Sequence, residues 1–534
     1  MKFLTRSILI VLALYGLVFA IGAAYLARSG APLWAVLAFP IVMVGVQYLI
    51  GPHLISWLLD ISWFDDGAGG LPEVNRKFVE QLCATRGLKV PRVGIIYSGT
   101  PNAFSFGRVK RDARVVVTSG LLEVLTSEEA NGVLAHEIGH IDHWDFAVMT
   151  VAGLAPLLLY QFYVYTERIN NVRVIAYTAY LCYLVSQFVV LMLNRTREYF
   201  ADQYAAEVTH APDTLSSALV KIAYGMVRAE GEYKKAMAEG SKEDKAVWRR
   251  ERRLGGALAV MGISNLRSGS ALALGHANPG EAAAVMKWDL VNPWAKVYEL
   301  NSTHPLTALR VRQLNEQAAE MHQTTTYPIR EEGRVWPKGF ALEFLLWAAP
   351  GLAVAALWLV FLWPEMLRYF GIQLPWTVKP MLLMFAGVAW MLRVAYRYRG
   401  GYEEATVGAL LEDTNVSQMR PRAVRLRGKI VGRGEPGAFW SPDLVFRDST
   451  GIVFLLYRQT IPFLRSIFAI AAAEKYIGQE IVVEGWFRRG FAPYVEMAKL
   501  TNDKGKSHRA ISRWVQLVLA ASAVAVGWLW LNGN

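Results

Sequence analysis

Long apolar stretches alternate with more polar segments along this chain. Seven of the apolar stretches are long enough for a helix to cross the hydrocarbon core of a bilayer, which takes about 20 mostly apolar residues. The first stretch follows Lys2 and Arg6, so a signal peptide is one interpretation. Its length, and the second apolar stretch directly after it, favour a retained helix. The pattern predicts a polytopic α-helical membrane protein with spans at 7–27, 33–59, 146–166, 173–193, 341–363, 379–395 and 512–531.

A different pattern occupies residues 405–502. Short stretches rich in β-branched and aromatic residues predict five strands there, AVRLRGKIVG, DLVFRD, GIVFLLYR, QEIVVEGWF and APYVEMAKL. The segment IPFLRSIFAIAAAEKYIG, between the third and the fourth, predicts a helix. Three strands, a helix and two strands form the order of an OB-like β-barrel. Such a barrel can bind a protein partner, a membrane surface or nucleic acid, and protein contact or regulation is the favoured role here.

These patterns divide the chain into successive domains. The part between the second and the fifth span is expected to be a mixed α+β domain, mostly helical over 205–300 and interrupted by a membrane hairpin. The predicted domains are 1–60 (two transmembrane helices), 61–340 (the α+β domain, with its hairpin at about 146–193), 341–395 (a transmembrane hairpin), 396–511 (the OB-like domain) and 512–534 (a C-terminal transmembrane helix).

Composition agrees with a membrane protein and suggests its orientation. Of the 534 residues, 54% are hydrophobic and only 19% are charged, and the net charge is +12. The Lys and Arg residues beside the spans all fall on one side if the N-terminus is cytoplasmic, which places the large polar segments in the cytoplasm. Nucleic-acid binding is the competing interpretation of the charge and is not expected. The two cysteines, Cys83 and Cys182, give no disulfide framework, since Cys182 lies in an apolar stretch.

The stretch LAHEIGHIDHWD, residues 134–145, concentrates side chains that bind metals. His136 and His140 are four residues apart, so on a helix they lie on one face, one turn apart. Both rings can then reach one tetrahedral Zn²⁺. Glu137 lies beside that face, where it can accept a proton from a zinc-activated water. A helix with ordinary solvated or core histidines is the alternative interpretation.

A catalytic zinc needs a third protein ligand and one open position. The stretch REYFADQYA, residues 197–205, supplies Glu198 as the candidate ligand, with Asp202 one helical turn later. Asp202 can accept a hydrogen bond from the second nitrogen of a ligand histidine and so fix its tautomer. Taken alone, these two acids would indicate a solvated helix face, but their combination with HEIGH favours the metal site.

His143 is the rival third ligand. Ligands at i, i+4 and i+7 on a straight helix spread over about 10 Å, which is too far for one ion. His143 is therefore expected at the surface or behind the ligands. Asp142 and Asp145 are expected to be solvated or structural.

Several motifs together resemble the HtpX and CAAX-prenyl-protease family of membrane zinc metallopeptidases. They are HEIGH, the distant EYFAD, and the upstream PNAFSFGR and VVVTSGLLEVLTSEEANGVLAHEIGH, and the match covers roughly residues 60–320. The resemblance implies a zincin-type peptidase domain of the gluzincin class. It implies His136, His140 and Glu198 as zinc ligands and Glu137 as the catalytic base.

The resemblance implies roles for two more residues. Asn102 of PNAFSFG matches a family position beside an edge strand, which could bind an extended peptide by β-addition; a simple turn residue after Pro101 is the alternative. His304, in NSTHPLTALRVRQL, matches a downstream element and could donate to the oxyanion; a histidine at a helix start is its alternative. Arg310 is either structural or part of the active site.

The sequence thus predicts a membrane-embedded zinc endopeptidase with one Zn²⁺ per chain and Glu137 as general base. Its substrates would be membrane or membrane-tethered proteins, and its active site would face the cytoplasm, in a bacterial inner membrane. A non-catalytic membrane scaffold that binds partners through the OB-like domain is the alternative, and the intact Glu137 argues against it. A zinc-regulated transporter is disfavoured because the ligands flank the spans and do not lie at mid-bilayer.

Overall fold

The computed structural model describes residues 30–59, 61–66, 70–167, 169, 173–223, 279–329, 339–362, 371, 373–433, 443–460, 462–471, 473–490, 493–503 and 505–533. Within these ranges, six helices are long and apolar enough to cross a membrane. They are α2 (Leu33–Leu58), α6 (Asp145–Thr166), α7 (Arg173–Thr209), α14 (Phe340–Leu362), α16 (Val378–Arg397) and α19 (Ser512–Asn532). Six of the predicted spans therefore coincide with apolar helices of sufficient length, and the predicted span 7–27 lies outside the described residues.

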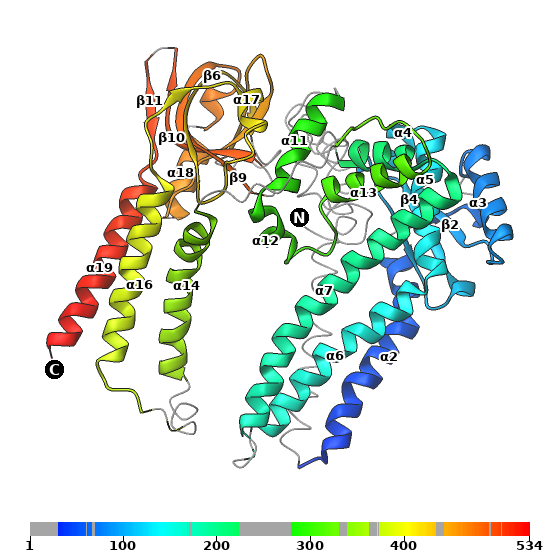
Figure 1. The fold of residues 1–534 in the computed structure, drawn as a ribbon, viewed down its shortest axis with the longest axis horizontal. Coiled ribbons are helices and arrows are strands. Elements are labelled where there is room, and N and C mark those ends of the chain that lie inside the picture. Colours follow the sequence, from blue (N-terminus) through cyan, green and yellow to red (C-terminus); the bar gives the residue numbers. More distant parts are fainter. Residues whose placement is uncertain are drawn as a thin grey trace. The chain divides into compact units, whose positions relative to one another are not determined.

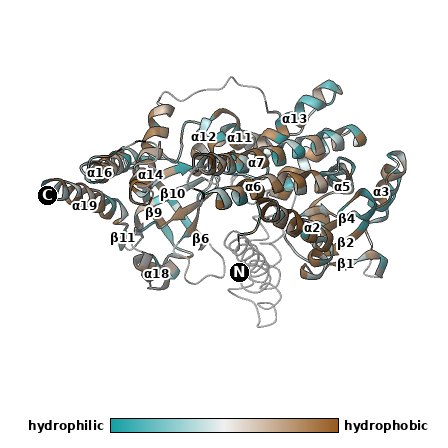
Figure 2. Cartoon of the chain, turned by 90° about the horizontal axis from the view of Figure 1, so that it is seen from below, coloured by the Kyte–Doolittle hydropathy of each residue, from teal (hydrophilic) through white to brown (hydrophobic). Residues whose placement is uncertain are grey.

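The surfaces of these six helices are apolar and exposed. Only 6–28% of each apolar window is buried inside the structure, and Val151 on α6 and Leu352 on α14 are 72% and 65% exposed. Figure 2 shows the hydrophobic colour on these helices. Such surfaces face lipid hydrocarbon at no cost, whereas in water they would be large apolar patches. The chain is a multi-pass membrane protein.

The chain separates into two compact units, Met1–Ala273 with Lys296–Glu331, and Leu274–Ala295 with Glu332–Asn534. In the first unit, α2 packs beside α6, and α6 beside α7 (Figure 1). α7 has 37 residues, far more than a bilayer requires. Its second half can therefore extend into water and carry polar side chains. The predicted span 173–193 and the predicted helix around 197–205 are one continuous element.

A four-stranded sheet lies in the first unit, in the order β1-β2-β4-β3. β2 and β4 are parallel, while β3 pairs antiparallel with β4 at the edge of the sheet. The strands are β1 (Ser62–Trp63), β2 (Arg92–Ile96), β3 (Ala103–Phe106) and β4 (Arg114–Thr118), with short 3₁₀ turns at Phe64–Asp66 and Lys110–Asp112.

Helices α3 (Glu73–Thr85), α4 (Ser119–Val124), α5 (Ser127–Asp142) and α13 (Thr307–Glu320) complete the water-facing part of this unit. α5 contacts both α3 and α7 and also touches β3 and β4. Its apolar side chains form one buried core with residues of α3, β4, the end of α7 and the helical segment 212–223. α5 is thus the central helix of the unit.

The second unit holds a closed β-barrel. β6 (Arg422–Arg433), β7 (Leu444–Arg447) and β8 (Ile452–Leu456) form an antiparallel run, β8 pairs in parallel with β10 (Pro493–Asn502), and β9 (Glu480–Arg489) joins β10 back to β6. α18 (Pro462–Ala471) and a 3₁₀ turn, Ala473–Tyr476, lie between β8 and β9. The predicted five-stranded barrel is confirmed, with its helix in the predicted place.

Smaller elements surround this barrel. β5 (Glu403–Glu404) pairs with β6, and β11 (Ser507–Arg509) pairs with β10. The remaining helices are α11 (Pro279–Val291), α12 (Pro293–Glu299) and α17 (Val407–Leu411). The carboxylate of Glu343, at the start of α14, accepts hydrogen bonds from Trp294, Ser417 and Arg420, which fixes α14 to the chain leading into the barrel.

Two glycines allow α16 and α19 to pack closely. A Cβ atom on Gly387 would come within 2.7 Å of the carbonyl oxygen of Ala520, and one on Gly527 within 2.6 Å of the side chain of Met384. Small residues at such contacts let membrane helices approach each other. The contacts also show that the two helices are antiparallel, so α16 ends where α19 begins.

Candidate metal centre

α5 begins at a capping box. The Thr126 hydroxyl accepts a hydrogen bond from the Glu129 amide at 3.3 Å, and the Glu129 carboxylate accepts one from the Thr126 amide at 2.9 Å. A cap of this kind contributes about 1 kcal/mol. The helix then passes through the core, where Val133 and Leu134 are fully buried. Packing thus fixes the helix that carries both histidines.

The predicted ligands come together from two helices. His136 and His140 on α5 and Glu198 on α7 each offer one ligand atom, and these atoms lie within 4.8 Å of one another. The two Nε2 atoms are 3.1 Å apart, and the Glu198 oxygens lie 3.7 and 3.6 Å from them. Donors 2.0–2.2 Å from a tetrahedral zinc lie about 3.3–3.6 Å from one another. The cluster therefore has the dimensions of a zinc site.

Gly139 makes this convergence possible. A Cβ atom there would lie 3.1 Å from the ring of Tyr204 and 3.4 Å from the Cα atom of Ala201, both on α7. The glycine between His136 and His140 is thus the point where α7 approaches α5. That approach brings Glu198 to the histidine face.

An aspartate stands behind each histidine. Nδ1 of His136 lies 3.0 Å from the carboxylate of Asp202, and Nδ1 of His140 lies 2.6 Å from Asp145. Arg310 donates two hydrogen bonds to Asp202 at 2.7 and 2.6 Å, and Arg197 lies 3.0 Å from Asp145. Each ring therefore turns its Nε2 towards the cluster and its Nδ1 towards a carboxylate, and each of these carboxylates is paired with an arginine.

Sequence reasoning missed the contact between Asp145 and His140. Asp145 is only 3% exposed and begins α6, directly after Trp144, whose φ of 60° lies in the left-handed region and separates α6 from α5. The signal that could have found it is general. A histidine that binds a metal through one ring nitrogen needs a hydrogen-bond acceptor for the other. Two such histidines need two acceptors, and only Asp202 is predicted for this role from the sequence.

The electrostatics of the cluster suit a cation. Burial disfavours the charged form of His136, but the carboxylates of Asp202 and Glu198 outweigh it and raise the pKa of this imidazole to about 9. The same negative field favours a divalent cation. Oε2 of Glu198 is also buried and has no hydrogen-bond partner among the described residues. A buried carboxylate oxygen that makes no hydrogen bond of ordinary geometry, 3.7 Å from Nε2 of His136 and 3.3 Å from Nδ1 of His304, fits a zinc ligand.

His304 lies at this cluster. Its Nδ1 is 3.3 Å from Oε2 of Glu198, and the residue is 7% exposed. α7 holds the loop that carries it, since Arg195 donates to the carbonyl oxygens of Glu299 and Ser302 at 2.8 and 2.9 Å. Residues of α7 thus provide the carboxylate of the cluster and also fix the loop with the third histidine.

The other predicted residues are placed as follows. Glu137 is 2% exposed on α5, next to His136. Asn102 directly precedes edge strand β3, and its side-chain oxygen accepts a hydrogen bond from the Ala103 amide at 2.9 Å. This bond is typical of a turn residue. His143 ends α5, is exposed, and contacts the rings of Phe200 and Tyr204, outside the ligand cluster.

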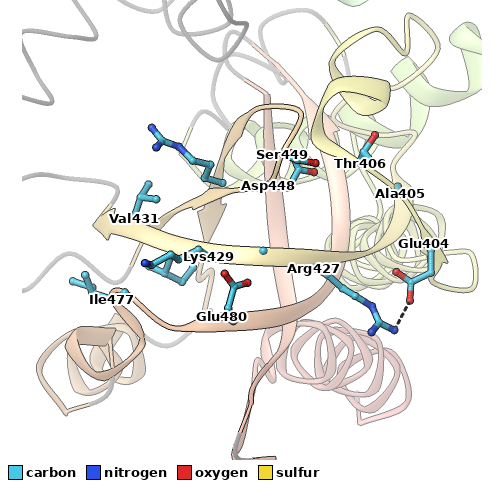
Figure 3. Close-up of a pocket in the computed structure, with 14 residues that line it drawn as sticks. Glu404, Ala405, Thr406, Arg427, Lys429, Val431, Asp448, Ser449, Ile477 and Glu480 are labelled. Atoms are coloured by element: carbon cyan, nitrogen blue, oxygen red, sulfur yellow. Dashed lines mark hydrogen bonds and ion pairs between the residues drawn. The ribbon is translucent and has the colours of Figure 1, made fainter.

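A large cavity of 930 Å³ lies elsewhere, on the barrel of the second unit. Figure 3 shows Lys429 near Glu480 and Arg427 paired with Glu404, at 3.2 Å. The described residues that line it include no histidine or cysteine, and three basic residues among them are balanced by three acidic ones. It does not have the donors of a zinc site.

Comparisons with known proteins agree with the site. The profile of peptidase family M48 matches residues 72–318. A protease HtpX homolog of Methanothermobacter thermautotrophicus is 36% identical over 226 residues, which are 41% of this chain and 86% of that protein. This chain belongs to peptidase family M48. The resemblance predicted from the motifs is confirmed, and the M48 chain is a protease.

Other relatives of this M48 peptidase give the same result. A protease HtpX homolog of Moorella thermoacetica is 33% identical over 239 residues, covering 42% of this chain and 77% of the relative. Among solved structures, S. mikatae Ste24p matches at 16% identity with a TM-score of 0.36, covering 58% of this chain and 67% of that one. The TM-score is low, so the assignment rests on the sequence matches. The family match ends before α14 and does not include the barrel.

Proposed function

We propose that this M48 peptidase is a zinc-dependent endopeptidase that cleaves membrane or membrane-tethered proteins, with its active site facing the cytoplasm. The observation that carries the proposal is the buried cluster of His136, His140 and Glu198, with Glu137 beside it on α5. The three donors have zinc spacing, and each histidine has its own carboxylate behind it.

The neighbouring side chains would perform the proton transfers. A zinc ion held by the three ligands would act as a Lewis acid and make a water molecule nucleophilic at neutral pH. Glu137 would accept a proton from the attacking water and pass it to the leaving amine. His304, with a buried Nδ1 that lacks a hydrogen-bond partner among the described residues, would donate to the developing oxyanion. Asn102 is proposed as a second donor.

The substrate would enter along β3. This strand is the edge of the four-stranded sheet, and α5 contacts it directly. An extended peptide can pair with such an edge through main-chain hydrogen bonds, which positions it without reading its side chains. Asn102 at the start of β3 then lies at the end of the peptide-binding edge.

The location of the cluster suggests the substrate class. α6 begins five residues after His140, and α7, which carries Glu198, is itself one of the membrane helices. The site therefore lies where two spans meet the membrane surface. Chains that are anchored in the membrane or emerge from it would reach such a site most readily.

The test compares wild type, Glu137→Gln and the control Glu128→Gln, all purified in detergent. Glu128 is exposed on the same helix, so its substitution removes one carboxylate but leaves the site intact. All three proteins should bind about one zinc per chain. Cleavage of casein, or self-cleavage, should fall by about 10²- to 10⁴-fold in Glu137→Gln only.

Each contrary outcome is informative. Absence of zinc in wild type would overturn the metal site. Full activity in Glu137→Gln would overturn the role of Glu137. Zinc without any cleavage by wild type would favour the non-catalytic scaffold.

A further inference from the structure

A small cavity of 160 Å³ lies where the membrane helices of the second unit join the barrel. One wall follows the end of α16, a second is the start of α19, and the third comes from β9 and β10. Its lining includes Tyr398 and Tyr402, Arg513 and Trp514, Arg458 and Glu496.

The cavity lies at the level of a membrane surface. α16 and α19 are antiparallel candidate spans, and the cavity is lined from their adjoining ends. Trp514 is 64% exposed in the first turn of α19, and Tyr402 lies shortly after α16. Tyr and Trp gather at the ends of membrane helices, where lipid headgroups begin. A lipid headgroup is therefore adjacent to this cavity in a bilayer.

The acidic residue of the cavity is already paired. Glu496 is 3% exposed, its carboxylate lies 2.9 Å from Arg488 and 3.5 Å from Arg397, and it accepts a hydrogen bond from Tyr398. Arg397, Arg458 and Arg488 all act on this one carboxylate and lower its pKa, so the surroundings of the cavity keep a net positive charge.

Two arginines of the lining remain without an acidic partner. Arg458 and Arg513 form no ion pair with any residue that the structure describes; Arg458 lies over the ring of Tyr494 at 4.9 Å. Nε of Arg513 is buried and lacks a hydrogen-bond partner among the described residues. The positive end of the α19 dipole adds to this charge. The cavity has the chemistry of a phosphate site.

We propose that this cavity binds the phosphate of an anionic phospholipid from the leaflet that surrounds α16 and α19. Guanidinium groups match phosphate oxygens in geometry and charge, and basic pockets between membrane helices are sites for anionic headgroups. The neighbouring exposed aromatic side chain of Trp514 would pack against the glycerol and upper acyl region. The bound lipid would tie the barrel to the membrane at one defined point.

The experiment is native mass spectrometry of the full chain in detergent, titrated with phosphatidylglycerol or phosphatidylcholine. Wild type should retain one phosphatidylglycerol at concentrations where phosphatidylcholine does not bind. The double variant Arg458→Gln/Arg513→Gln should lose about tenfold or more in affinity for phosphatidylglycerol. The control Arg509→Gln removes an exposed charge from β11, near the same membrane surface but outside the cavity, and should bind as wild type does.

Three results would overturn the proposal. They are equal binding of both lipids to wild type, an equal loss in Arg509→Gln, and full displacement of the lipid by millimolar glycerol phosphate, which would assign the site to a free phosphate ester. If the double variant does not fold, Arg458→Lys/Arg513→Lys replaces it. Lysine keeps the positive charge but cannot bind phosphate in the bidentate manner of arginine, so lipid binding should be weaker. Unchanged binding would count against a defined phosphate site.

Discussion

His136 and His140 each present one ring nitrogen to the ligand cluster and the other to an aspartate. The two aspartates differ in how deeply their arginine partners are buried. Asp202 forms a fully buried pair with Arg310, whereas Arg197, the partner of Asp145, is 15% exposed at its side chain. Loss of Asp202 would therefore also leave a buried charge without its partner, which destabilises the fold. Asp145 gives the cleaner test of ligand orientation.

Asp145→Asn should weaken zinc binding by about 10- to 100-fold, because the amide no longer supports the tautomer and basicity of His140. Competition with a fluorescent zinc chelator measures this affinity. Asp142→Asn is the matched control, since Asp142 lies only three residues earlier and pairs with Lys110 at 2.6 Å. Equal losses in both variants would show a general charge effect and contradict the orientation role.

The local ligand pair could be predicted from sequence, while Asp145 could not be found by helical spacing. HEIGH places two histidines within one turn of a single helix, so no tertiary information is needed to bring them together. On a continuous helix, Asp145 would lie about 140° round from His140 and point elsewhere. α5 ends at Asp142, and Trp144, with its positive φ, lets α6 start in a new direction. That change of direction is a property of the fold and not of the spacing.

Helix α5 contains two glycines that sit in different surroundings. A Cβ atom on Gly139 would meet Tyr204 of α7 at 3.1 Å, whereas one on Gly132 would meet Leu215 at an ordinary 3.5 Å. Alanine is the better helix former at both positions by about 0.5–1 kcal/mol. The same substitution on the same helix should therefore have opposite effects at the two positions.

Gly139→Ala should push α7 away from α5 by a few tenths of an ångström and weaken zinc binding, with a packing cost of about 1–3 kcal/mol. Gly132→Ala should leave zinc affinity unchanged and raise thermal stability slightly. Zinc affinity and the melting temperature in detergent measure both effects. Unchanged zinc affinity in Gly139→Ala would show that the distance between the two helices does not set the ligand geometry.

At the scale of elements, periodicity predicted the spans and the barrel but not the small sheet. A run of about 20 apolar residues is typical of a helix that crosses a bilayer. Short segments of alternating apolar and polar residues, separated by turns, are likewise a distinctive pattern for strands. β2 and β4 are short, mostly apolar runs, which periodicity alone cannot separate from buried helix. The length of α7 was also missed, because a hydropathy pattern marks where a span ends and not where the helix ends.

For the whole molecule, the end of the family match lies close in sequence to a boundary between the two compact units. The match ends at residue 318, and the second compact unit holds everything after residue 331 together with 274–295. The barrel unit has its own charged core, in which Arg488 is fully buried and pairs with Glu496. That core should stabilise the second unit without affecting the metal cluster of the first.

Glu496→Gln should therefore destabilise the barrel unit by about 3 kcal/mol or more, because it leaves Arg488 buried without its counter-charge. Glu484→Gln is the control on neighbouring strand β9. Glu484 pairs with Arg425, whose side chain is 40% exposed, and such a pair contributes about 1 kcal/mol or less. Trypsin digestion at rising temperature, with the cuts located by mass spectrometry, should reach barrel sites at a lower temperature only in Glu496→Gln. Zinc content should stay at the wild-type level in both variants. Loss of zinc along with the barrel would instead mean that the two units depend on each other for stability, and the peptidase core could not then be treated as an independent part.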